Sequence, residues 1–144
     1  MPKSLYITEA DRDVLVRLLS SRQPAHHDVK ALVDLKVELE RAVVVPPEAI
    51  PADVVTMNSM VRLTDLDTGR RGEYALVFPG SADFRLGRLS VLAPVGTALL
   101  GQREGDVVEW VVPAGRKRYR IDAIVYQPET DGAHPPRRPV HAAA

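Results

Sequence analysis

The chain has 144 residues, with 19 Lys or Arg and 19 Asp or Glu, so its formal net charge is zero. Its 45% hydrophobic content excludes a chain that is disordered throughout. Its zero net charge argues against a nucleic-acid binder that works by bulk charge. No apolar run reaches the ~18 residues of a membrane span. Cysteine is absent, which excludes disulfides, thiolate catalysis and cysteine-ligated metals. A chain of this length fits one domain, or a small domain with an appendage.

The N-terminal segment predicts a first helix over about residues 9–21. Thr8 can cap it, acidic residues follow in its first turns, and apolar residues recur at helical spacing from Ala10 to Leu19. The pattern stops at the breaker stretch 20–24. Because the chain start lacks the ~7–15 consecutive apolar residues of a secretory signal, we expect a cytoplasmic protein.

A second helix is predicted from about Asp28 to about Ala42, ahead of two prolines. Its apolar seam has the 3-4-3 spacing of a coiled coil and consists of Leu32, Leu35, Leu39 and Ala42. Three further residues widen that stripe: Val29, Val33 and Val37. Joined by a short loop, the two helices predict an antiparallel coiled-coil hairpin over residues 1–45, with arms about 20 Å long.

Beyond a proline-rich linker over 43–51, the hydrophobic period changes from 3.6 to 2, which predicts strands. We expect about five or six antiparallel strands, at 54–57, 61–64, 73–78, 88–92, 106–112 and 117–126. Residues 67–69 predict a hairpin turn, and 94–101 predict one short helix, opened by proline and followed by glycine. The fold class is therefore α+β: the helical hairpin, an antiparallel β domain over 46–128, and a disordered tail over 129–144.

Residues that carry chemistry are sparse. His26 and His27 are adjacent, so they make a poor metal pair and are interpreted as solvated; His134 and His141 lie in the tail and receive no role. Phosphate-cradling and nucleophile motifs are missing. Two carboxylate pairs flank predicted turns, where acidic residues are common: Asp65 with Asp67, and Glu104 with Asp106. The residues alone predict a non-enzymatic binding protein, with no catalytic residue, metal or cofactor.

A basic cluster occupies the last predicted strand. It consists of Arg116, Lys117, Arg118 and Arg120. Alternation places Arg118, Arg120 and Asp122 on one face of the strand and Tyr119, Ile121, Ala123 and Val125 on the other. The cluster is either a solvated sheet face or a surface for an acidic partner. Most of the aromatic residues fall at predicted strand positions and are expected in the core. The full set is Tyr6, Tyr74, Phe78, Phe84, Trp110, Tyr119 and Tyr126.

Three segments resemble one known family. Residues 50–59, IPADVVTMNS, resemble the domain entry of the Rnk regulators of nucleoside diphosphate kinase. Residues 89–101, LSVLAPVGTALLG, followed by Glu-Gly-Asp at 104–106, are similar to the signature shared by Rnk and the GreA/GreB transcript-cleavage factors. Residues 125–129, VYQPE, resemble the Rnk C-terminus. The likeness extends over about residues 5–129.

The resemblance implies an FKBP-like C-terminal domain, an N-terminal antiparallel coiled coil and binding to bacterial RNA polymerase at its secondary channel. In the Gre factors the globular domain docks on the channel rim and a longer coiled coil enters the channel. The stretch here that matches the docking segment is Ala93, Pro94 and Val95. We add the basic residues Arg118 and Arg120 as candidate polymerase contacts.

The expected hairpin tip departs from the cleavage factors. Their acidic tip places a Mg²⁺ ion for RNA cleavage, and this hard cation prefers oxygen anions. The tip region here contains no carboxylate; its polar side chains include Arg22, Gln23, His26 and His27. It resembles that of Rnk-like proteins, which occupy the channel without stimulating cleavage. Two alternatives remain: an FKBP-like prolyl isomerase, against which the few, scattered aromatics argue, and an effector of nucleoside diphosphate kinase.

Overall fold

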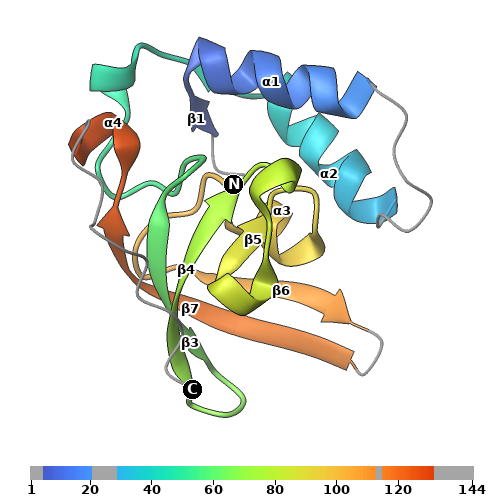
Figure 1. Cartoon of the computed structure of the whole chain (residues 1–144), viewed down its shortest axis with the longest axis vertical. Coiled ribbons are helices and arrows are strands. Elements are labelled where there is room, and N and C mark those ends of the chain that lie inside the picture. The colour runs from blue at the N-terminus through green and yellow to red at the C-terminus, as the bar shows by residue number, and fades with distance from the viewer. Residues whose placement is uncertain (1–4, 21–28, 113–114, 132–144) are drawn as a thin grey trace.

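The computed structural model describes residues 5–20, 29–112 and 115–131 (Figure 1). Its helices are α1 (Glu9–Ser20), α2 (Val29–Glu40), α3 (Pro94–Leu99) and α4 (Pro128–Asp131), with short 3-10 turns η1 (Pro47–Ala49), η2 (Pro79–Ser81) and η3 (Phe84–Leu86). Its strands are β1 (Tyr6–Ile7), β2 (Val43–Val44), β3 (Met60–Asp65), β4 (Arg71–Val77), β5 (Arg88–Ser90), β6 (Val107–Val112) and β7 (Gly115–Tyr126). The chain is therefore a mixed α+β protein, as predicted.

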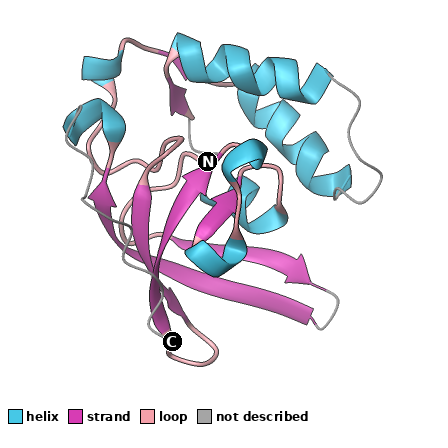
Figure 2. Ribbon diagram, in the orientation of Figure 1, coloured by secondary structure: helices cyan, strands magenta, loops and turns pink. Residues whose placement is uncertain are grey.

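A five-stranded sheet forms the centre of the molecule, in the order β5-β4-β3-β7-β6 (Figure 2). The predicted hairpin turn is confirmed between β3 and β4, where Gly69 has a φ of 77°, a backbone conformation that glycine adopts without strain. The expectation of a wholly antiparallel sheet is wrong at one edge. β5 runs parallel to β4, with Ala75 opposite Arg88, because the chain between them passes through η2 and η3 before it pairs again.

The predicted strand at 54–57 is reduced to an isolated bridge between Val54 and Arg103. Hydrogen bonds from a neighbouring turn explain the difference, since the Thr56 backbone N–H donates to the Ser59 hydroxyl at 2.9 Å. Asn58 within that turn has a φ of 66°, which cannot continue a strand.

Two short strands tie the helical pair to the rest of the chain. β2 lies inside the predicted linker and pairs in parallel with β1, Tyr6 opposite Val43, a contact that the sequence did not indicate. The pairing holds the start of α1 beside the end of α2, whereas the opposite ends of the two helices lie apart (Figure 1). The pair is therefore anchored at its base.

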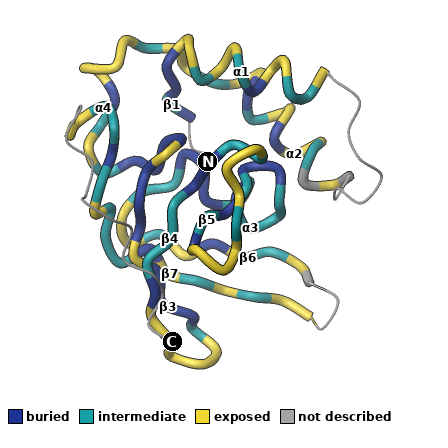
Figure 3. Tube along the Cα trace, viewed as in Figure 1, coloured by how far each residue is buried: buried dark blue, intermediate teal, exposed yellow. Residues whose placement is uncertain are grey.

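The apolar seam of α2 is confirmed in its centre, where Leu35 and Leu39 are buried. The prediction that valines widen this stripe is wrong for Val33 and Val37, which are exposed (Figure 3 shows the exposed flank of α2). The buried leucines join Leu15 of α1 in the same hydrophobic cluster as the sheet, so α2 turns a narrow face toward the core.

The end of β7 departs from simple alternation. The pairing of β7 with β3 shifts register twice, and neither Asp122 nor Val125 stands opposite a residue of β3. Ala123 therefore pairs with Arg62, and Ile124 pairs with Val61. The prediction that Ala123 and Val125 share a face with Ile121 is therefore wrong. Val125 is exposed, and Ile124 packs against the core instead.

The segment 128–131 forms α4, so the expectation of a disordered tail is wrong for its first residues. The buried Gln127 precedes this helix, and its side-chain amide donates to the carbonyls of Pro51 and Val54 at 2.8 and 2.7 Å. Asp131 in turn accepts from the Gln127 backbone N–H at 2.8 Å. The rest of the expected tail, 132–144, lies outside the described residues.

We predict that Gly96→Ala destabilises the fold strongly. α3 approaches β5 so closely that a Cβ at Gly96 would lie 1.9 Å from the Ser90 carbonyl oxygen, which is backbone and cannot swing away. The expected loss is about 3 kcal/mol or more in the free energy of unfolding, measured by urea denaturation.

Gly80→Ala is the matched control, since a Cβ there meets no atom within 4 Å. Its free energy of unfolding should change by less than about 1 kcal/mol. Equal losses in the two variants would show that the approach of α3 to β5 is not what makes Gly96 necessary.

Candidate functional site

The turn into α3 carries three of the five expected polymerase contacts. Ala93 is extended, with φ −79° and ψ 153°, and precedes Pro94 at the first helical position, where the missing N–H of proline costs nothing. Two side chains fix the turn, because the Ser90 hydroxyl accepts from the Leu92 N–H at 3.1 Å and the Thr97 hydroxyl donates to the Val91 carbonyl at 2.7 Å. Ala93, Pro94 and Val95 are half-buried, so the turn presents a rigid, mostly apolar surface.

An open apolar pocket of about 270 Å³ lies beside this turn. It is lined by Ala82, Asp83, Phe84, Arg88, Leu89, Ser90, Ala93 and Val95. The pocket thus joins the α3 turn to β5 and to the η3 segment before β5. Pockets of this kind hold apolar groups of a ligand or partner.

Phe84 is an exception to the expectation that most of the aromatic residues lie in the core. Its side chain is 76% exposed, more than any other large hydrophobic side chain that the structure describes. The cause is local: the Asp83 carboxylate accepts from the Arg85 N–H at 3.0 Å and caps η3, while Gly87 ends it with a φ of 72°. The bracketing Asp and Gly were the sequence signal for a loop here, and sequence reasoning missed it.

Arg118 and Arg120 lie apart from this pocket. They belong to β7, and the strands β4 and β3 separate β7 from β5 in the sheet, a distance of about 14 Å. Both are paired with acids of this chain, Arg118 with Asp67 at 3.4 Å and Arg120 with Asp122 at 2.7 Å. The third exposed arginine of the strand, Arg116, pairs with Glu109 at 2.7 Å. The geometry therefore favours a solvated, self-neutralised face over a surface for an acidic partner.

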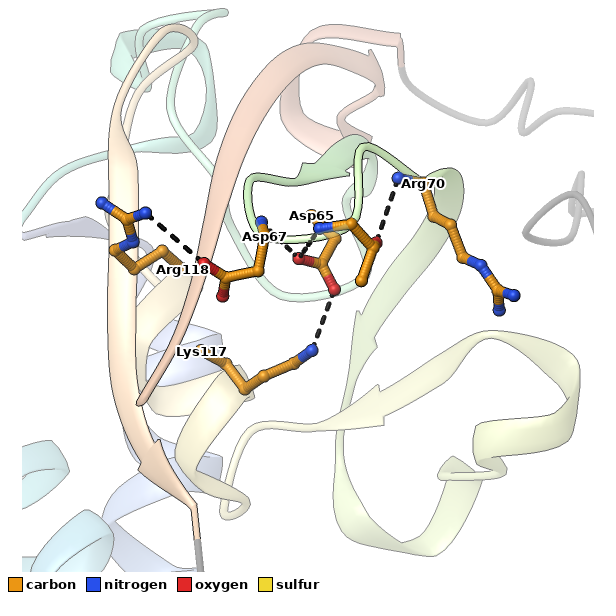
Figure 4. Close-up of polar contacts among 6 residues, drawn as sticks. Asp65, Asp67, Arg70, Lys117 and Arg118 are labelled. Atoms are coloured by element: carbon orange, nitrogen blue, oxygen red, sulfur yellow. Dashed lines mark hydrogen bonds and ion pairs between the residues drawn. The ribbon is translucent and has the colours of Figure 1, made fainter. Parts of the chain in front are cut away.

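Lys117, the remaining member of the basic cluster on β7, has a structural role (Figure 4). Its ammonium donates to the buried Asp65 carboxylate at 2.9 Å, and the same carboxylate accepts from the Asp67 and Thr68 N–H groups at 2.8 and 3.2 Å. Burial would raise the pKa of Asp65, but the hydrogen bonds from Lys117 and the two amides outweigh it and hold that pKa below its usual range. Asp65 thus fixes the β3–β4 turn.

The second carboxylate pair, Glu104 with Asp106, also forms hydrogen bonds to backbone amides of its own chain. Asp106 accepts from the Arg103 N–H at 2.8 Å, and Glu104 accepts from the Ile124 N–H at 3.0 Å, where the register of β7 shifts. Within the part of the chain that is described, no group of three His, Asp or Glu side chains could hold a metal ion. None of the described helices is long and apolar enough to cross a membrane. The expected tip residues Arg22, Gln23, His26 and His27 lie outside the described residues.

The attachment of the helical pair includes two carboxylates from distant segments. Thr8 caps α1 by accepting from the Asp11 N–H at 3.3 Å, as the sequence predicted. Glu129 of α4 accepts from the Thr56 hydroxyl at 2.6 Å. Burial and the negative charge of Glu129 together raise the pKa of Asp11 from 3.8 to about 6. The junction therefore holds a carboxyl group that favours its neutral form.

Comparison with known proteins gives consistent results. Residues 50–126 match the sequence profile described as "Transcription elongation factor, GreA/GreB, C-term". The chain is 38% identical over 130 residues to the "Regulator of nucleoside diphosphate kinase" of Escherichia coli K12, covering 90% of this chain and 94% of that protein. It is 40% identical over 90 residues to GreA of Clostridium botulinum, 62% of this chain and 56% of that one. A solved GreA/GreB structure from Nitrosomonas europaea superposes with a TM-score of 0.73 and 40% identity, covering 88% of this chain and all of that one.

We predict that Asp11→Asn raises stability at pH 8 and flattens its dependence on pH. Because the folded state binds this proton more tightly than the unfolded state, the wild-type free energy of unfolding should fall as pH rises from about 4 through 6. After allowance for solvent screening at this half-exposed group, the gain at pH 8 should be about 1 kcal/mol. Urea denaturation from pH 4 to 8 measures it.

Asp13→Asn, one residue beyond Arg12 on an exposed position of α1, is the control and should change stability by less than about 0.5 kcal/mol at either pH. If the free energy of unfolding depended on pH in the same way in the wild type and in Asp11→Asn, the raised pKa could not belong to Asp11.

Proposed function

The chain belongs to the GreA/GreB family of transcription elongation factors, and from this membership we propose that it is a non-catalytic transcription regulator. It binds RNA polymerase at the secondary channel, competes there with Gre-type factors and does not stimulate transcript cleavage. The observation that carries the proposal is the expected tip: residues 20–27 contain no carboxylate, so they lack the oxygen anions that Mg²⁺ requires. The 38% identity to a protein named as a regulator supports it.

The docking surface in this proposal is the α3 turn. Its half-buried Ala93, Pro94 and Val95 are fixed by the Ser90 and Thr97 hydrogen bonds and border the apolar pocket. A preorganised apolar surface loses little conformational entropy on binding. Arg118 and Arg120 have a smaller part in the proposal, because acids of the same chain already pair with them.

Nucleoside diphosphate kinase is the second candidate partner, on the single ground of the name that the Escherichia coli relative bears. One pull-down with purified core RNA polymerase and nucleoside diphosphate kinase separates the two. Retention of polymerase alone supports the channel proposal, and retention of the kinase alone refutes it. A prolyl isomerase is not favoured, since the named relatives are regulators and elongation factors.

We predict that Val95→Asp weakens binding to core RNA polymerase at least tenfold. The variant would bring an unpaired carboxylate into an apolar contact, where its desolvation is costly. Fluorescence anisotropy of labelled protein measures the change in Kd. Val111→Asp is the control, because Val111 is 66% exposed on β6, away from the pocket. A folded Val95→Asp variant, checked by circular dichroism, that binds as tightly as wild type would remove the turn from the interface.

We also predict that grafting carboxylates into the tip, as Gln23→Asp with His26→Glu, does not create cleavage activity. α1 and α2 have 12 residues each, so each helix reaches only about 18 Å, and new oxygens would stop short of a distant active centre. A misplacement of ~1 Å can already reduce a rate on the order of 10²-fold.

The assay measures cleavage of a backtracked transcript at saturating wild type or graft, against polymerase alone. Both proteins should leave the background rate unchanged and both should slow cleavage by an added Gre factor. Stimulation by the wild type would refute the non-catalytic assignment, and stimulation by the graft alone would refute the argument from helix length. Failure of the wild type to compete would refute binding at the channel.

A further inference from the structure

Phe84 is 76% exposed, so its own chain covers little of its side chain. Packing does not hold it in place; the cap from Asp83 and the left-handed Gly87 fix the backbone of η3 on either side of it. A large apolar side chain that is exposed to water raises the free energy of the unbound protein. Because a rigid turn already fixes its backbone, little conformational entropy is lost when a partner covers it. Such aromatic side chains are typical anchors of protein interfaces.

The pocket beside Phe84 sets the kind of group that can cover it. Its lining includes the apolar residues Leu89, Ala93 and Val95, and its volume is about 270 Å³. An apolar cavity of about 150 Å³ already admits a benzene ring. The pocket therefore has room for an aliphatic or aromatic side chain of a partner, packed against the ring of Phe84.

Charge at the edge of the pocket sets what should lie next to that group. Arg85 follows Phe84, its side chain is 92% exposed, and its guanidinium lies 3.8 Å from the Asp83 carboxylate. Arg88 lines the pocket and forms no ion pair with the residues that the structure describes. Two guanidinium groups and one carboxylate leave a net positive charge here, in contrast to the paired arginines of β7.

We infer that this pocket receives a polymerase segment in which an apolar anchor side chain is flanked by at least one carboxylate, with Phe84 covering the anchor and Arg85 and Arg88 binding the acid. The inference rests on the proposed function and names the partner chemistry of its docking surface. A second copy of this chain fits less well, because a pocket-to-pocket contact would bring two pairs of arginines together.

The test measures the Kd for core RNA polymerase with wild type, Phe84→Ala, Arg85→Glu and Arg88→Glu at 50 and 300 mM salt. Phe84→Ala should weaken binding about tenfold or more at both salt concentrations. The charge reversals should weaken it several-fold at low salt and less at high salt, because salt screens exposed charges. Arg85→Lys should restore most of the affinity, since it keeps the charge.

Two controls match these changes. Val111→Ala truncates another exposed apolar residue, and Arg70→Glu reverses an arginine on the β3–β4 turn whose side chain points away from the Asp65 cluster (Figure 4). Both should stay within twofold of wild type. Circular dichroism and thermal melts confirm that every variant is folded.

If wild type binds and the three pocket variants bind equally well, the inference fails and the proposed function stands. If wild type does not bind polymerase, the proposed function fails and the inference fails with it. If light scattering shows a wild-type dimer that Phe84→Ala dissociates, the occupant is a second copy and the inference is overturned.

Discussion

The close approach of α3 to β5 at Gly96 is the constraint on which the candidate site depends. With no Cβ at this position, the first turn of the helix rests against the Ser90 carbonyl, and the chain can turn directly from strand to helix. That turn places Ala93 and Val95 beside Leu89, so that they line one pocket. A side chain at Gly96 would push the helix away from the strand and open the pocket wall.

A shared core joins the helical pair to the sheet and gives it a defined direction. Leu15 and Leu35 are buried in the same cluster as Val61 and Ile121 of the central strands. The β1–β2 pairing then fixes the base of the two helices. Because the base is fixed by packing and by backbone hydrogen bonds, the outer ends of the helices are carried at a set position relative to the α3 turn, as a two-point contact with one large partner would require.

The sequence sufficed for the elements whose signals are local. Caps, periodicity and turn residues located α1, α2, the β3–β4 hairpin and α3, because Thr8, Gly69 and Pro94 act within a few residues of themselves. It failed where the deciding contact is distant in the chain. The β1–β2 pair, the parallel β5 and the shifts in β7 depend on partners that no local pattern reveals. The pocket was missed for the same reason, and the exposure of Phe84 was not predicted, although the turn residues Asp83 and Gly87 bracket it.

The net charge of the chain is zero, but its positive charges that lack a close partner are unevenly distributed over the surface. The arginines of β7 each lie 2.7 to 3.4 Å from a carboxylate of the same chain, so they contribute little electric field beyond the surface. Arg85 and Arg88 lack such close partners within the described residues and lie beside apolar groups. In the proposed complex, the long-range attraction of an acidic partner and the apolar contact after docking would both fall on the same few residues of η3 and β5. A charge count from the sequence, which weights every arginine equally, points to β7 instead.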